Sequence, residues 1–186
     1  MANWPISAIK LMLNRVKQVI AALTAKVTAA DRGFIRETLR AEEQALFYAM
    51  NLPDQRHSLN VAYTALEMAE GRAEVDRGLL LKSALLHDVG KIKGDVSTLD
   101  KILTVLAHRI APCWAEGWGQ RGRGGKVANL RHAFHTYFHH PERSAELLAA
   151  VGVEQEIIGI IRRHHAEPQP DDQPELILLR QADDLH

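Results

Sequence analysis

The stretch LLLKSALLHDVGKIKG, residues 79–94, decides the fold of this chain. It starts as an apolar run and ends in an adjacent histidine and aspartate. Leu80 and Ala84 stand one helical turn apart, and His87 and Asp88 follow at the next turn of the same face. That face should pack into a core, where an imidazole and a carboxylate must be paired, hydrogen-bonded or coordinated, because burying them bare is costly.

Two residues after this pair add to the pattern. Gly90 permits backbone angles that end a helix, and Lys91 brings a cation within reach of the pair. A histidine next to an aspartate is by itself a weak signal, because a solvated helix end explains it equally well. The positions of the other histidines therefore decide its meaning.

The composition bounds the class of protein. The chain has 186 residues, of which 46% are hydrophobic and 25% charged, and this suits one globular domain with a sizeable core. Lys+Arg and Asp+Glu both number 23, so the net charge gives no argument for nucleic acid or a membrane as a partner. Cys113 is the single cysteine, so no intramolecular disulfide can form, and we expect a cytoplasmic protein.

Helical spacing of apolar residues recurs along nearly the whole chain, so we expect an all-α fold. Thr28, with Asp31 three residues later, predicts a capping box at the start of one helix. Pro141 is expected at the first position of another helix. Further helices are expected over residues 7–27, 41–50, 54–70, 97–110 and 153–165, and around 176–183. Within 97–110, the residues expected to point inward are Leu99, Ile102, Leu103, Leu106 and Ile110.

The first 23 residues, MANWPISAIKLMLNRVKQVIAAL, have apolar stretches that are broken by Lys10, Arg15 and Lys17. They lack the uninterrupted apolar run of a secretion signal or a membrane span. We expect an amphipathic helix that packs on the domain, and attachment to a membrane surface is the alternative. Residues 1–50 are accordingly expected to form an N-terminal helical extension, and 51–186 the domain that carries the chemistry.

The helical pattern breaks down over residues 111–125, which are rich in glycine and locally basic, with RGRGGK at their end. We expect a loop here. A solvated surface loop is one interpretation, and a lid over an anionic ligand is the other. In the second case Arg121 and Arg123 would contact the ligand.

Five expected helices each carry a histidine or a carboxylate at an end or edge of an apolar stripe. Such side chains are the usual ligands of zinc, iron and manganese. Five histidines and two carboxylates exceed what one metal takes, so the set suits two ions that share a bridging carboxylate inside a helical bundle. A lone histidine is more often a hydrogen-bonded core residue, so the joint pattern carries this prediction. The set comprises His57, His87, Asp88, His140, His164, His165 and Asp183.

The stretches RHSLNVA, LLHDVGK, HHPERSAELL, RRHH and ADDL resemble the HD-domain metal-dependent phosphohydrolase superfamily. The resemblance covers about residues 54–185. The order and spacing of the ligand-type residues are similar to the binuclear branch, which includes the HD-GYP and HDIG-type phosphodiesterases, although no GYP tripeptide follows His165. The implied fold is an HD-domain helical bundle preceded by the extension.

The resemblance also implies roles for individual residues. Asp88 would bridge two ions, Lys91 would serve the phosphate, and Asp184 is the alternative to Asp183. Iron or manganese is favoured over magnesium, with nickel, zinc and cobalt as alternatives. The implied ligands of the first ion are His57, His87, Asp88 and Asp183, and those of the second are Asp88, His140, His164 and His165.

The expected activity is that of a metal-dependent phosphodiesterase or phosphatase. Two ions would lower the pKa of a shared water, so that a bridging hydroxide attacks phosphorus, with Asp88 and Lys91 as catalytic residues. Lys91, Arg121 and Arg123 would bind the substrate, which we expect to be a nucleotide: a cyclic dinucleotide, a dinucleoside polyphosphate or a mononucleotide. The alternatives are a di-iron oxygenase on the same scaffold and a non-catalytic HD-type signalling module. We expect no nucleic-acid partner and no membrane span, and the oligomeric state stays open.

Overall fold

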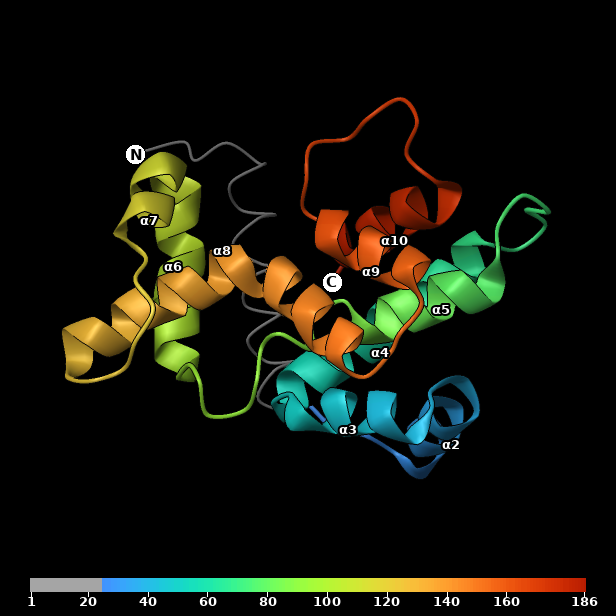
Figure 1. Cartoon of the computed structure of the whole chain (residues 1–186), viewed down its shortest axis with the longest axis horizontal. Helices are drawn as coiled ribbons and strands as arrows, with labels where there is room; N and C mark the ends of the chain where they lie inside the picture. Colours follow the sequence, from blue (N-terminus) through green and yellow to red (C-terminus); the bar gives the residue numbers. More distant parts are fainter. Residues whose placement is uncertain (1–24) are drawn as a thin grey trace, which may run out of the picture.

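The computed structural model describes residues 25–186, and these residues form nine helices and no strand (Figure 1). The all-α prediction is therefore confirmed. Within this part of the chain, no helix has the length and hydropathy that a bilayer-spanning segment needs. The helices are α2 (Ala29–Thr38), α3 (Ala41–Ala49), α4 (Leu52–Met68), α5 (Arg77–Leu86), α6 (Thr98–Ile110), α7 (Pro112–Trp118), α8 (Lys126–Ala150), α9 (Gln155–Arg163) and α10 (Pro174–Asp184).

The start of the described chain is held by the predicted capping box. The Thr28 hydroxyl accepts a hydrogen bond from the Asp31 backbone N–H at 3.1 Å, and the Asp31 carboxylate accepts one from the Thr28 N–H at 2.8 Å. That carboxylate also accepts from Arg56 and Tyr63 of α4, both at 2.8 Å. The cap therefore fastens α2 to α4. The helix expected over residues 7–27 lies outside the described residues except for 25–27, which are not helical.

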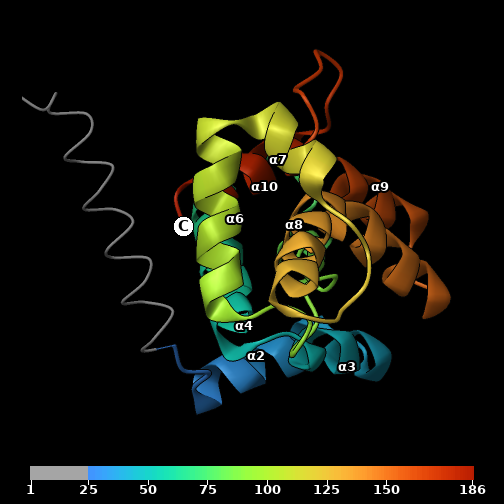
Figure 2. The same cartoon turned by 90° about the vertical axis from the view of Figure 1, so that its left-hand side faces the viewer.

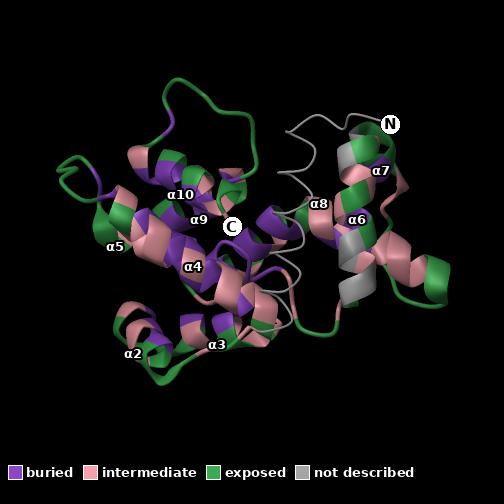
Figure 3. Ribbon diagram, turned by 180° about the vertical axis from the view of Figure 1, so that it is seen from behind, coloured by how far each residue is buried: buried purple, intermediate pink, exposed green. Residues whose placement is uncertain are grey.

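The core lies between α4, α5, α9 and α10, with the second half of α8 against α9. Figure 3 shows buried positions concentrated on these helices. The fully buried side chains at their contacts are aliphatic, and they include Leu59, Leu80, Leu86, Ile161 and Leu179. Burial of such side chains supplies the main driving force for the fold, so the ends of these helices are held in fixed relative positions.

Helix α6 contradicts part of the sequence analysis. It packs on α7 and α8 (Figures 1 and 2), but Leu103 and Leu106 are each 49% exposed and Ile110 is 83% exposed. Among the described side chains of α6, Thr104 faces inward and is 1% exposed, and His108 contacts Tyr137 and Phe138 of α8. The prediction that Leu103, Leu106 and Ile110 point inward is therefore wrong, because α6 packs on α8 through its polar side. The side chains of Leu99 and Ile102 lie outside the described part.

The expected loop over residues 111–125 is also wrong in part, because residues 112–118 form α7. This helix is held by aromatic packing. Trp114 and Trp118 stack with their ring centroids 5.6 Å apart, and both present edge-to-face contacts to Phe134 of α8. Residues 119–125 are irregular, as expected.

Helix α8 runs through Pro141 instead of starting there. The prediction of a helix start at this proline is therefore wrong, and the 25-residue helix tolerates the proline in its interior. A proline cannot donate the helical hydrogen bond to the carbonyl four residues earlier, which here belongs to Tyr137. That carbonyl finds another donor in the site described next.

Candidate metal centre

The seven predicted ligand side chains come together at the centre of the bundle. His57 comes from α4 and Asp183 from α10, and their Nε2 and Oδ1 atoms lie 2.9 Å apart. His87 and His164 are the C-cap residues of α5 and α9, so Asp88 and His165 follow directly after a helix end. His140 projects from the middle of α8 toward the same point.

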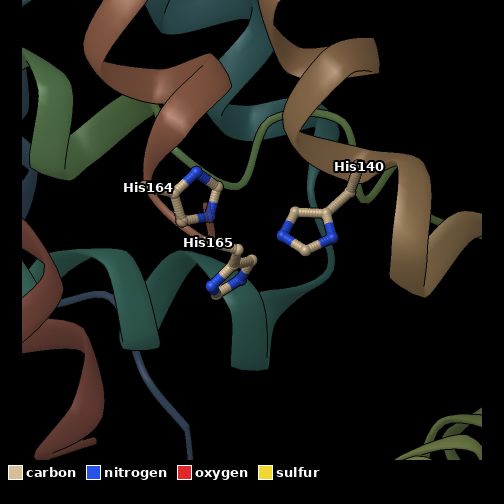
Figure 4. A group of neighbouring side chains, drawn as sticks. All are labelled: His140, His164 and His165. Carbon is tan, nitrogen blue, oxygen red and sulfur yellow. The ribbon is translucent and has the colours of Figure 1, made fainter. Parts of the chain in front are cut away.

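Three groups of these side chains have ligand atoms within 4.8 Å of one another. Figure 4 shows the imidazoles of one group converging from α8 and from the end of α9. Asp88 joins this group to another, because its Oδ1 lies 3.2 Å from His140 Nε2 and its Oδ2 lies 3.5 Å from His87 Nε2. The two oxygens of one carboxylate therefore face two sets of imidazoles. The three groups are His140 with His164 and His165, His57 with His87 and Asp88, and His87 with His164 and Asp183.

The backbone fixes the orientation of three of the rings in the same way. Each ring has its Nδ1 within hydrogen-bond distance of the carbonyl three residues earlier: His87 to Ala84 at 2.8 Å, His140 to Tyr137 at 2.6 Å and His164 to Ile161 at 2.5 Å. A carbonyl can only accept, so Nδ1 carries the proton and Nε2 presents a lone pair. Such a bond is the usual support of a metal-ligating imidazole.

These carbonyls lie where a helix leaves its C=O groups without a full set of partners. Ala84 and Ile161 are in the last turns of α5 and α9, where carbonyls lack the regular helical donor four residues on, and the Ile161 carbonyl accepts only a long backbone bond of 3.4 Å from the His164 N–H. The Tyr137 carbonyl lies inside α8, but Pro141 supplies no N–H to it. Because of the proline, the Tyr137 carbonyl can accept a hydrogen bond from His140 Nδ1, and this bond orients the ring.

The residues fit a bound cation. The Nε2 atoms of His87, His140 and His164 are buried and have no hydrogen-bond partner among the described residues. With Nδ1 protonated, each Nε2 is an acceptor that faces other acceptors, including the Asp88 carboxylate. Such an arrangement of buried lone pairs is unfavourable unless a positive charge lies between them.

The protonation states agree with this interpretation. Burial lowers the pKa of His140 to about 4 and that of His164 to about 3, and at His140 the charge of Lys91 adds to the effect of burial. Both rings are therefore neutral near pH 7, which is the form that binds metal. For His57 the burial, which lowers the pKa, is outweighed by the hydrogen bond with Asp183, so its pKa is raised.

Lys91 and Asp88 form the closest charged pair of the site, with Nζ 2.7 Å from the carboxylate. Burial alone would raise the pKa of Asp88, but the charge of Lys91 outweighs it and holds that pKa well below its usual range. The pKa of Lys91 is raised in turn, because the negative charge of Asp88 outweighs its own burial. Asp88 is fully buried, whereas His165 is exposed and Lys91 is partly so, so the site opens to solvent on the side of these two.

Ser144 belongs to the site although its sequence context did not single it out. It lies one turn after His140 in α8 and is fully buried. Its hydroxyl accepts a hydrogen bond from the Gly90 N–H and donates one to the His87 carbonyl, both at 2.9 Å. It thereby fixes α8 against the turn that carries Asp88. This bond could not be predicted from the residues around Ser144, because its partners are more than fifty positions away in the chain.

Gly90 has a different role from the one expected. Its φ is not among the positive values, so it does not serve to end α5 through a left-handed conformation. Instead, a Cβ at this position would lie 2.5 Å from the His140 carbonyl oxygen and 2.9 Å from Ser144 Oγ. Glycine is needed because the turn and α8 approach each other so closely.

Three predicted residues do not share this centre. Arg121 and Arg123 are exposed and line a cavity of about 650 Å³ at the start of α8, together with Lys126 and Arg131. The helix rise places His140 roughly 20 Å from the first turn of α8. Asp184, the alternative to Asp183, is exposed.

A family model described as HD domain matches residues 55–186, which include all seven converging side chains. No curated protein and no solved structure matches the chain.

Proposed function

The chain belongs to the HD domain family, and from that membership we propose that it is a metal-dependent phosphohydrolase with two ions in one site. Family membership supports hydrolase chemistry in general. The number of ions and the nucleotide substrate are our proposals, and they rest on the arrangement of this chain's own side chains.

The position of Asp88 carries the proposal of two ions. Its Oδ1 faces His140, which is grouped with His164 and His165, and its Oδ2 faces His87, which is grouped with His57. A carboxylate with one oxygen toward each ligand group is suited to bridge two cations. The low pKa of Asp88 keeps it ionised for this role.

When bound, such ions lower the pKa of a coordinated water and neutralise charge on phosphoryl oxygens. The chain's own residues would do the rest. His57, His87 and Asp183 would hold one ion, and His140, His164 and His165 the other. Lys91 lies at the open side with its ammonium toward Asp88, so it can also contact a phosphate oxygen of the substrate.

The substrate proposed is a phosphate ester or anhydride of a nucleotide. A site lined by neutral imidazoles, with a lysine at its open side, suits an anionic group that binds to metal and ammonium together. The three candidate classes are cyclic dinucleotides, dinucleoside polyphosphates and mononucleotides.

The test is phosphate release by purified full-length protein that has been stripped of metal and reloaded with Mn²⁺ or Fe²⁺. The panel comprises bis-p-nitrophenyl phosphate, p-nitrophenyl phosphate and the three nucleotide classes. We expect metal-dependent turnover of at least one nucleotide, and its loss in Asp88→Asn. Asp31→Asn is the matched control, because it removes a buried carboxylate charge outside the site.

Two outcomes would contradict the proposal. One is the absence of metal-dependent hydrolysis across the whole panel. The other is oxygen consumption by the iron-loaded protein with a polyol or phosphonate, which would assign the scaffold to oxygenase chemistry instead.

A further inference from the structure

Arg180 of α10 reaches the end of α9 that carries two of the candidate ligands. Its Nε donates a hydrogen bond to the His164 carbonyl at 3.2 Å, and its Nη2 donates one to the Arg163 carbonyl at 2.8 Å. The last carbonyls of a helix lack regular donors, and a positive charge beside them is favourable. One guanidinium therefore holds the turn from which the rings of His164 and His165 project.

Asp172 fixes Arg180 in this position from the other side. Its carboxylate accepts hydrogen bonds from Arg180 Nη1 at 2.5 Å, from the Gln169 N–H at 2.9 Å and from the Arg163 guanidinium. The side chain of Asp172 is 1% exposed and that of Arg180 is 13% exposed, so this ion pair is largely shielded from water. Residues 164–173 form the loop that joins α9 to α10 (Figure 1), and these bonds fasten the loop at both ends.

His165 is the ring that depends most on this turn. The rings of His87, His140 and His164 are each fixed by a hydrogen bond between Nδ1 and the carbonyl three residues earlier. Within residues 25–186 the His165 ring has no such carbonyl bond, and its contacts are with the imidazoles of His140 and His164. The backbone that carries His165 therefore sets its place, and Arg180 is bonded to that backbone one residue earlier.

Helix α10 also carries a candidate ligand of the other ion. Asp183 follows Arg180 by three residues, so the two side chains lie one turn apart on the same side of α10. Asp183 Oδ1 lies 2.9 Å from His57 Nε2, whereas Arg180 contacts the turn of His164. A shift of α10 against α9 would therefore change the distance between the two groups of ligands.

We propose that Arg180 is a positioning residue for the ion held by His164 and His165, and that Asp172 fixes its guanidinium. This inference rests on the proposed function, because it needs two ions in one site. Loss of a bond that supports a metal ligand typically lowers the affinity by about 10–100-fold. The loss should fall on this ion alone, because the chain that carries His57 lies in α4 and has no bond to Arg180.

The test is equilibrium dialysis of full-length protein, stripped of metal, against Mn²⁺. Arg180→Gln should lower the affinity for one of the two ions by about tenfold or more and leave the affinity for the other unchanged. Arg162→Gln is the matched control, because it removes an arginine charge from the same end of α9, where Arg162 pairs with Glu142 at 2.9 Å. It should change neither affinity. Equal weakening of both ions in Arg180→Gln, or no change, would overturn the proposal.

A double-mutant cycle identifies the ion that is affected. Arg180→Gln should cause little further loss when it is added to His165→Gln, because both substitutions act on the same ion. Added to His57→Gln, it should cause its full loss, because these two substitutions act on different ions. Additive losses with His165→Gln would overturn the proposal.

Asp172→Asn provides the test if Arg180→Gln does not fold. It leaves the guanidinium present but removes the charge that fixes it, so the affinity for the same single ion should fall. Unchanged affinities in folded Asp172→Asn protein would overturn the role of Arg180 and leave the proposed function standing. Wild-type protein that binds fewer than two ions would contradict the proposed two-ion site itself, and this inference with it.

Discussion

The hydroxyl of Ser144 lies 2.9 Å from the backbone nitrogen of Gly90 and accepts its hydrogen bond. The same hydroxyl donates to the His87 carbonyl, so one side chain of α8 holds both ends of the turn around Asp88. We predict that Ser144→Ala lowers the free energy of unfolding by about 1–3 kcal/mol, because a buried N–H and a buried C=O lose their partner. Metal affinity should fall about tenfold, as measured by titration of the metal-free protein.

The control for this prediction is Ser83→Ala. Ser83 is equally buried, but its hydroxyl has no hydrogen-bond partner among the described residues. This substitution should leave metal affinity unchanged. If the two serine variants behaved alike, the bridge between α8 and the turn would have no part in setting the site.

Gly90→Ala should disturb the site through steric contact. Its new methyl group would lie 2.5 Å from the His140 carbonyl, so the turn and α8 must separate and the distance between Asp88 and His140 must grow. We expect loss of metal-dependent turnover and a lower melting temperature. Gly159→Ala in α9, where nothing lies within 4 Å of a new Cβ, should instead raise stability by about 0.5–1 kcal/mol. A wild-type-like Gly90→Ala enzyme would refute the close approach.

The metal-free protein should lose stability as the pH falls from about 6.5 toward 4. The unfolded chain takes up protons on histidine near pH 6.5. The pKa of buried His140, however, is lowered to about 4 in the folded state. Between these values protonation favours the unfolded chain, so stability is present above pH 6.5 and is lost on acidification, by about 3 kcal/mol for this one residue.

The measurement is urea unfolding of chelator-treated protein at several pH values. His140→Gln should make the dependence between pH 6.5 and 4 shallower, because its side chain does not titrate, and the dependence that remains is expected from His164, whose pKa is lowered to about 3. An unchanged slope in this variant would show that His140 is not held neutral by its surroundings.

Substitution of Lys91 should lower the hydrolytic activity, whereas substitution of Arg121 and Arg123 should not. Lys91 contacts Asp88 in the metal centre. Arg121 and Arg123 instead line the cavity at the start of α8. Lys91→Gln should lower kcat/KM for a small phosphate ester by about 100-fold or more. Arg121→Gln with Arg123→Gln should leave it unchanged. A large loss in the arginine variant would bring these residues back to the site, as the sequence alone had led us to expect.

The helices that carry the ligands could be predicted because local rules fix them. The apolar residues before His87 and before His164 have the same helical spacing, and each histidine follows at the end of its helix. Thr28 and Asp31 form the capping box that their three-residue spacing indicates. In these cases the residues that determine the structure are neighbours in sequence.

The failures have a common physical origin in contacts between distant segments. The spacing of Leu103, Leu106 and Ile110 shows that α6 is a helix, but it does not show which side α8 receives. Proline is favoured at the first position of a helix, yet here α8 packs on α6 and α7 before Pro141 and on α9 after it, and the helix continues through the proline. Ser144 was missed because a serine is ordinary until its partners are known.

The central claim is that His57, His87, Asp88, His140, His164, His165 and Asp183 form one metal centre. The most direct test is the metal content of the full-length protein, reloaded with Mn²⁺ or Fe²⁺, desalted and measured by elemental analysis beside Asp88→Asn. We predict two ions per wild-type chain and fewer than one per variant chain. A wild-type protein that retains no metal, or a variant that retains as much as the wild type, would contradict the account.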